Sequence, residues 1–163
     1  MAKQLIDPAD KFSCQKHVVE ETAPGVGTYK GIWEEANVIY AYTRQQAIED
    51  GVLVDLMQPG FIDLVQDAGF KFPVAMTAAA FHDYVELTPV AREMGNNLKG
   101  RLWDVLWMLR MAIRKHRGDP GEIMYQFYCV TDRIKPRLCN LKAVCGPGDQ
   151  GEPVLTIMHP WQD

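Results

Sequence analysis

One long amphipathic segment constrains this fold more than any other feature of the sequence. Between residue 98 and about residue 116, apolar side chains recur at the i, i+3, i+4, i+7 spacing of one helix face. They are Leu98, Leu102, Val105, Leu106, Leu109, Ala112 and Ile113. A stretch containing Gly and Pro at 118–121 ends the pattern, and the basic residues at 114–116 suit the negative end of a helix dipole. The spacing predicts a long helix against which the other elements pack.

The C-terminal third is predicted to be antiparallel sheet. Three runs, at 124–130, 138–145 and 154–158, have the composition of strands. In the second run, Cys139, Leu141 and Ala143 alternate with Asn140 and Lys142, which is typical of a strand with one buried face. A turn-rich stretch at 146–153 predicts a hairpin loop between the last two strands.

Shorter elements are expected before the long helix. They are strands at 38–42 and 52–56, helices at 45–50 and 61–68, an extended stretch at 72–74 and a further helix after residue 77. Thr43 and Gln46 have the spacing of a capping box, and Gly51 is placed to end that helix. Thr77 is expected to cap the last of these helices, and the Thr88-Pro89 pair is expected to close it.

These elements predict an α+β fold with a small, mixed or mostly antiparallel sheet, helices packed on one side, and a C-terminal three-stranded meander. The chain has 163 residues, of which 47% are hydrophobic. At this length folding buries about 70% of the surface of the unfolded chain, so a core forms without metals or disulfides. Residues 1–36 show little periodicity and are expected to form an irregular arm, followed by a single domain at 37–163.

Composition excludes several classes of protein. The formal net charge is −4, whereas general nucleic-acid binders carry a basic excess. Apolar runs are shorter than the roughly 20 residues that span a membrane, and the N-terminal residues lack the apolar segment of a signal peptide. We therefore expect a cytoplasmic protein that does not contact membranes, with its cysteines reduced.

Motifs for catalysis or cofactor binding are weak. Cys14 and His17 have metal-ligand spacing, but Cys139 and Cys145 lie about 20 Å apart along a straight strand, too far to share one zinc ion. The glycine-rich loop at 146–151 lacks the lysine and the following helix of a phosphate-binding loop. We expect no metal, no cofactor and no catalytic residues, and buried thiols at most of the cysteines.

Two groups of residues are candidates for binding. On the long helix, Trp103 and Trp107 share a face with nearby arginines, a pattern that suits base stacking or the carboxylates of a partner. The alternative is that both tryptophans belong to the core. The second group, Tyr42, Thr43 and Arg44, lies where a strand gives way to a helix, a place where functional side chains are common.

Four blocks of the sequence carry a family resemblance. They are residues 39–55, 68–74, 100–108 and 141–149, within a region of similarity at about 37–160. This region resembles a family of uncharacterised small proteins encoded on bacterial plasmids, phages and integrated elements. The resemblance implies a setting in which proteins act against host defences or support element maintenance, and it implies no particular activity. Polar residues of these blocks that packing does not demand are Thr43, Arg44, Asp55, Arg101, Asp104 and Lys142.

The leading hypothesis is a non-catalytic accessory protein that binds a host protein or a protein–nucleic-acid assembly. Its candidate contact residues are Tyr42, Thr43, Arg44, Arg101, Trp103, Asp104 and Trp107. The runner-up is an enzyme acting on a nucleotide or nucleic acid, such as an ADP-ribosyltransferase-like transferase, because the strand, short helix and glycine at 39–53 loosely match that class. The Ser-Thr-Ser strand and paired glutamates of such enzymes are not evident. A single-stranded nucleic-acid binder that uses the Trp/Arg helix is a third hypothesis. The oligomeric state is left open.

Overall fold

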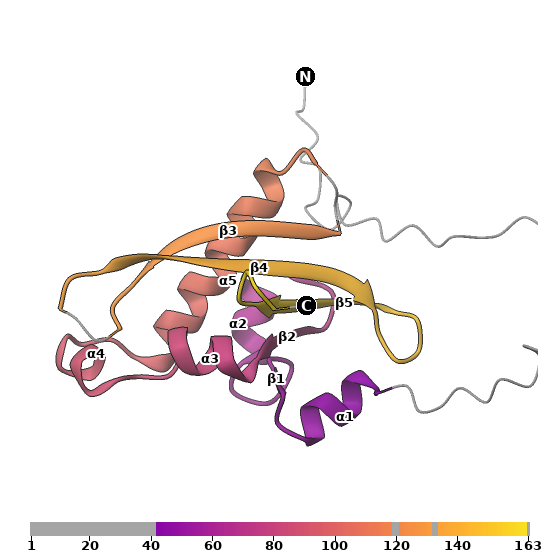
Figure 1. Ribbon diagram of the computed structural model, residues 1–163, viewed down its shortest axis with the longest axis horizontal. Helices are drawn as coiled ribbons and strands as arrows, with labels where there is room; N and C mark the ends of the chain where they lie inside the picture. The colour runs from indigo at the N-terminus through magenta and orange to yellow at the C-terminus, as the bar shows by residue number, and fades with distance from the viewer. Residues whose placement is uncertain (1–41, 119–120, 132–133, 163) are drawn as a thin grey trace, which may run out of the picture.

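The computed structural model describes residues 42–118, 121–131 and 134–162. The arm at 1–36 and most of the strand at 38–42 therefore lie outside the described residues. The helices are α1 (Arg44–Glu49), α2 (Ile62–Asp67), α3 (Ala78–Tyr84), α4 (Pro89–Glu93) and α5 (Leu98–Lys115). The strands are β1 (Leu53–Asp55), β2 (Val74–Thr77), β3 (Glu122–Cys129), β4 (Arg137–Pro147) and β5 (Pro153–Met158), all visible in Figure 1.

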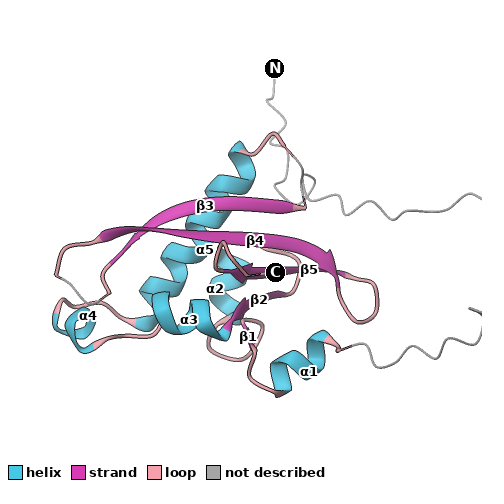
Figure 2. Cartoon of the chain, viewed as in Figure 1, coloured by secondary structure: helices cyan, strands magenta, loops and turns pink. Residues whose placement is uncertain are grey.

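The strands form one mixed sheet in the order β1-β2-β5-β4-β3 (Figure 2). Strands β3, β4 and β5 pair antiparallel in sequence order, which confirms the predicted C-terminal meander. Strand β2 pairs parallel with β5 and antiparallel with β1. The fold is therefore α+β, as predicted, and among the strands of the described ranges β1 and β3 lie at the two edges of the sheet.

The core lies between one face of the sheet and the helices. Buried and exposed side chains alternate along β3, and the buried ones, all on this face, are Ile123, Tyr125, Phe127 and Cys129. Helix α5 is at the centre of the core, where Leu102, Leu106 and Leu109 are fully buried. Helix α3 packs on the same face, because the ring of Tyr84 meets that of Phe127 edge-on at 5.5 Å between centroids. We call this the helix face of the sheet.

Local sequence signals explain most helix boundaries. The Thr43 hydroxyl accepts the Gln46 N–H, and the Gln46 side chain accepts the Thr43 N–H, which confirms the capping box. Thr77 caps α3 as predicted. The prediction that Thr88-Pro89 only closes a helix is incomplete, because this pair also starts α4. The Thr88 hydroxyl caps α4, and Pro89 occupies its first turn. Proline is tolerated there because a backbone N–H in the first turn has no acceptor within the helix.

Candidate functional site

The start of α1 is fastened to the hairpin loop between β4 and β5. The Asp149 carboxylate accepts the backbone N–H groups of Arg44 at 2.7 Å and Gln45 at 2.9 Å. The Thr43 hydroxyl accepts the next N–H, that of Gln46, at 3.1 Å. These contacts satisfy the N–H groups that the first turn of a helix leaves open, and they place a negative charge at the positive end of α1. Thr43 is therefore used for capping.

The Arg44 side chain lies on the face of the sheet opposite the helix face. Its Nη1 donates to the Thr156 hydroxyl at 3.2 Å, while its Nη2 is buried without a hydrogen-bond partner among the described residues. Burial lowers the pKa of the Arg44 guanidinium, and the carboxylates of Asp55, Asp149 and Glu152 oppose that shift. Arg44 thus connects α1 to the middle of the sheet, close to three carboxylates.

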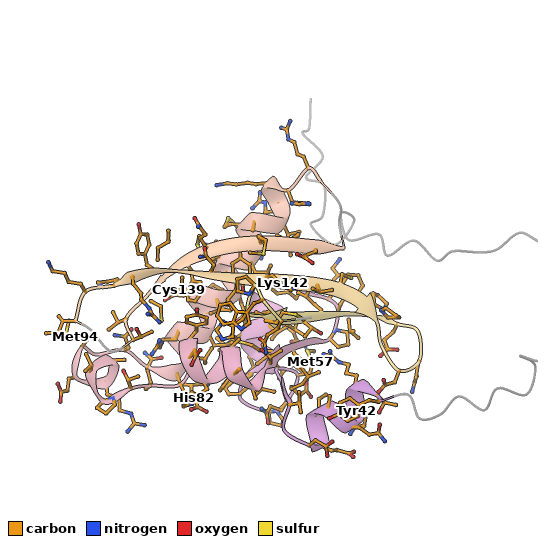
Figure 3. The ribbon with its side chains drawn as sticks, viewed as in Figure 1. Tyr42, Met57, His82, Met94, Cys139 and Lys142 are labelled. Carbon is orange, nitrogen blue, oxygen red and sulfur yellow. The ribbon has the colours of Figure 1, made fainter. Side chains whose placement is uncertain are left out.

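The remaining polar candidates near this face also have partners. The Tyr42 hydroxyl donates to the Asp50 carboxylate at 2.9 Å, and the Asp55 carboxylate accepts the Met57 N–H at 2.9 Å. Lys142 is buried on β4, with its ammonium 3.9 Å from the Glu122 carboxylate. Figure 3 shows Tyr42 at the start of α1 and Lys142 over the middle of the sheet. The structure therefore unites Tyr42, Thr43 and Arg44 around α1.

The two candidate tryptophans of α5 are stacked on each other. The rings of Trp103 and Trp107 lie 5.5 Å apart between centroids with 19° between their planes. Trp103 packs against the core, whereas Trp107 is 39% exposed. The alternative that both tryptophans belong to the core is therefore right for Trp103 and wrong for Trp107, whose ring lies on the surface.

Arg110 completes this aromatic stack. Its guanidinium carbon lies 5.5 Å from the Trp107 ring centroid, within cation–π range. Its Nη1 also donates to the Ala68 carbonyl oxygen at the end of α2. A side chain at Gly69 would place its Cβ only 2.5 Å from that nitrogen, so glycine leaves room for the guanidinium. We define Trp103, Trp107 and Arg110 as the aromatic stack.

Arg101 and Asp104 line a small cavity on the other flank of α5. The cavity has a volume of about 210 Å³ and is also lined by Tyr84, Phe127 and Cys129. Arg101 is only 4% exposed, donates to the Glu86 carbonyl oxygen at 3.0 Å and contacts the Cys129 sulfur. These contacts join α5 to the end of α3 and to the end of β3.

The ionisable groups of this cavity are shifted mainly by burial. Burial raises the pKa of the Cys129 thiol, and the neighbouring Arg101 opposes that shift without cancelling it. Burial also raises the pKa of the Asp104 carboxyl, again opposed by Arg101. A thiol with a raised pKa stays protonated at neutral pH and is a poor nucleophile. Cys129 is therefore suited to packing rather than to covalent chemistry.

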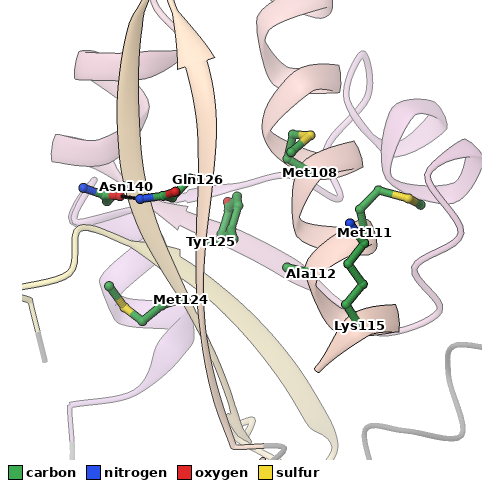
Figure 4. A pocket seen from close by; sticks show the side chains of 8 residues that line it. All are labelled: Met108, Met111, Ala112, Lys115, Met124, Tyr125, Gln126 and Asn140. Carbon is green, nitrogen blue, oxygen red and sulfur yellow. Dashed lines mark hydrogen bonds between the residues drawn. The ribbon is translucent and has the colours of Figure 1, made fainter. Parts of the chain in front are cut away.

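A groove between α5 and β3 was not found by reasoning from the sequence. It has a volume of about 420 Å³ and is lined by Met108, Met111, Ala112, Lys115, Met124, Tyr125, Gln126 and Asn140 (Figure 4). Tyr125 points from β3 toward α5 in this view, and its buried hydroxyl has no hydrogen-bond partner among the described residues. The available signal was the methionine content, because flexible methionines are common at binding surfaces. The sequence did not show that α5 and β3 bring them together.

A second feature that the sequence did not reveal is the cluster around His159. This buried imidazole stacks on Trp161 at 4.3 Å between centroids and meets Tyr84 at 5.2 Å. Its Nε2 lies 3.1 Å from the Asp83 carboxylate. Gln162 accepts hydrogen bonds from the His159 N–H and the Thr77 hydroxyl, both at 2.9 Å. The cluster thus fastens the chain after β5 to α3 and β2.

Across residues 42–118, 121–131 and 134–162, no group of three or more His, Cys, Asp or Glu side chains has the arrangement of a metal site. Within the same ranges, every helix is too short or too polar to cross a bilayer. Cys14 and His17, considered above as a ligand pair, lie outside the described residues.

A model for a family of unknown function, DUF6573, matches residues 29–163. The match begins ahead of residue 37, so residues 29–36 of the predicted arm fall within the family region. Comparisons with curated proteins and with solved structures found no match. Because the family model covers most of the chain, the protein belongs to DUF6573, a family of unknown function.

Proposed function

We propose that this protein is a non-catalytic accessory protein that binds a host protein or a protein–nucleic-acid assembly through the outer face of α5. The observation that carries the proposal is the position of Trp107, which is exposed yet in contact with both Trp103 and Arg110. An exposed aromatic ring that is already ordered loses little conformational freedom on binding. Tryptophan and arginine are also the residue types that contribute most to binding energy at interfaces.

The neighbouring surface extends the apolar area around this ring. Met108 follows Trp107 along α5 and is also exposed, and Met111 lies one turn further along, in the wall of the groove. Basic residues at 114 and 115 follow in the last turn of α5. An apolar centre beside basic side chains suits a partner with apolar and acidic groups.

The buried polar groups favour binding over catalysis. Arg101, Thr43 and Arg44 all have structural partners, and the Cys129 thiol is kept protonated by burial. A catalytic site usually presents an activated nucleophile or an ordered acid–base pair to its substrate. The His159 imidazole packs against the rings of Tyr84 and Trp161 and, with Asp83, attaches the C-terminal residues to α3.

The mobile-element setting rests on the resemblance of the four sequence blocks alone. In that setting an accessory protein that acts by binding would block or recruit a host component, including a component of a defence system. The link between setting and function is one of association.

The test is an interaction experiment that compares two exposed tryptophans. Tagged full-length protein is expressed in a bacterial host, and co-purifying proteins and nucleic acids are quantified. We expect Trp107→Ala to reduce recovery of the specific partner by about tenfold or more, since a central aromatic anchor is worth at least about 2 kcal/mol. The matched control is Trp161→Ala, which removes a ring that is more exposed than that of Trp107 and belongs to the His159 cluster.

Retention of every partner by the Trp107→Ala variant would contradict the proposed surface. Binding of a labelled single-stranded oligonucleotide that weakens with salt and requires Trp107 would instead favour the nucleic-acid hypothesis. Transfer of ADP-ribose to a host protein, seen as a mass shift with the cofactor present, would favour the enzyme hypothesis.

A further inference from the structure

Strand β3 is a long edge strand with one open side. It pairs with β4 over all eight of its residues, Glu122 to Cys129, without a bulge. Among the described residues, no strand pairs with its other side. The Cys145 N–H donates to the Gly121 carbonyl oxygen at 2.8 Å, which fixes the phase of the ladder. Backbone groups of the odd-numbered residues therefore point to β4, and those of the even-numbered residues point outward.

This edge lacks the features that normally prevent pairing between chains. Natural edge strands are protected by lysine, proline, bulges or shortness. Between Ile123 and Cys129 the strand has no charge and no proline. Met124 is 54% exposed, and Tyr128 on the same face is also exposed. The opposite edge, β1, is only three residues long, contains Asp55 and is directly connected to α1.

We propose that β3 pairs with β3 of a second copy of this chain, antiparallel about a two-fold axis at Tyr125. The pairing would make one continuous sheet from two copies, with the helices of both on the same face. It uses every outward-pointing residue of both strands, with Met124 opposite Gln126 of the second copy and Glu122 opposite Tyr128. Because the β1 edge is short and protected, the assembly closes at two copies and does not grow.

Charge favours this arrangement. Glu122 is the only charged residue of β3, and it lies at one end of the strand. Antiparallel pairing places the two Glu122 side chains at opposite ends, about 20 Å apart at the usual rise per residue, where their repulsion is screened. Opposed side chains in the rest of the two β3 strands are neutral, so no like charges face each other within the strand pair.

The same pairing would also cover the groove beside β3 with the second copy. Met108, Met111 and Ala112 line it on the helix side, next to the open edge. A second copy brings its own groove to the same place, so apolar side chains of the two α5 helices meet across the axis. The buried Tyr125 hydroxyl, which lacks a partner among the described residues, then lies beside Tyr125 of the second copy. Trp107 and Arg110 do not line this groove and remain available to other partners, while Met108 and Met111 pass into the contact between the two copies.

The test measures the mass of the full-length protein in solution and locates the contact. Sedimentation equilibrium is expected to show a mass of twice 18.5 kDa that dissociates on dilution. We expect Met124→Lys, which adds a charge at the edge, to raise the dimer dissociation constant by about tenfold or more. The matched control is Leu138→Lys on β4, which puts the same charge at a similarly exposed apolar position on the same face but away from the edge and should leave the dimer unchanged.

Residue-resolved hydrogen exchange makes the inference falsifiable even if a variant folds poorly. In the wild-type protein, the amides of Met124, Gln126 and Tyr128 should become protected as concentration rises, while those of Tyr125 and Phe127 are protected throughout by β4. A protein that stays at 18.5 kDa at all concentrations would overturn the inference. So would a dimer whose even-numbered amides exchange rapidly, or an open-ended oligomer.

Discussion

Around α1 and the neighbouring β1 edge, polar side chains make specific contacts within the fold, whereas the β3 edge presents apolar side chains and a row of backbone groups. Near β1, Asp149 caps α1, Arg44 reaches Thr156, and Asp55 accepts a backbone N–H. Along β3, Met124 and Tyr128 face outward, and the adjacent groove is lined by Met108 and Met111. The polar residues named here make contacts within the fold, whereas the exposed apolar residues are the ones that both proposals assign to partners.

The largest expected change in stability comes from a polar residue at the end of β3. It tests whether polar residues stabilise the fold at this edge as they do near β1. Arg101 lies beside β3 and, like the polar residues near β1, makes its contacts within the fold, with Glu86 and Cys129. We expect Arg101→Ala to lower the free energy of unfolding by about 3 kcal/mol, because it removes a buried side chain and a hydrogen bond. Urea denaturation measures the change. The exposed Arg92→Ala variant is the control and should stay within about 0.5 kcal/mol of wild type.

A smaller effect is expected at the β1 edge itself. Asp149→Ala leaves the N–H groups of Arg44 and Gln45 without their acceptor and removes the charge at the N-terminus of α1. We expect a loss of about 1 to 2 kcal/mol of unfolding free energy and faster amide exchange in α1. Gln150→Ala, in the same loop, should change neither quantity. An Asp149→Ala variant as stable as wild type would show that the polar contacts of this edge are incidental.

The smallest effect concerns pH and the cavity beside β3. Burial raises the pKa of Asp104, so the folded protein holds this proton more tightly than the unfolded chain. The stability from this group is present below the unfolded pKa and is lost as pH rises through the folded pKa. We therefore expect Asp104→Asn to be slightly more stable than wild type at neutral pH. The difference should close as pH falls below both pKa values, which thermal unfolding at a series of pH values measures. A difference that grows on acidification would contradict the burial argument.

Sequence periodicity was enough to predict most elements of the fold. The stripe on α5 and the Thr43 and Thr77 caps depend on neighbours within a few residues, so local patterns reveal them. The parallel pairing of β2 with β5 depends on contacts between segments far apart in the chain, and no local pattern specifies it. The start of α4 was missed because a Thr-Pro pair serves equally well to end one helix and to begin the next.

The candidate site was less predictable for a related reason. Thr43, Arg44 and Arg101 are candidates because they are polar within distinctive sequence blocks, but polarity alone does not distinguish a residue with a structural role from one with a functional role. Arg44 meets Thr156, and Arg101 meets Cys129, only after the sheet has formed. The sequence does not predict the α5–β3 groove, because the methionines that line it come from two elements whose contact no local pattern specifies.

Gly69 has a consequence for how related chains can vary. Its φ of +87° already disfavours most side chains, and the Arg110 guanidinium occupies the space that a Cβ would need. The residue at position 69 and the residue at position 110 are therefore coupled across two helices. Among homologues, we expect a larger residue at the first position only where the arginine at the second has been replaced, so paired variation at these sites would serve as an evolutionary record of the Trp107 surface.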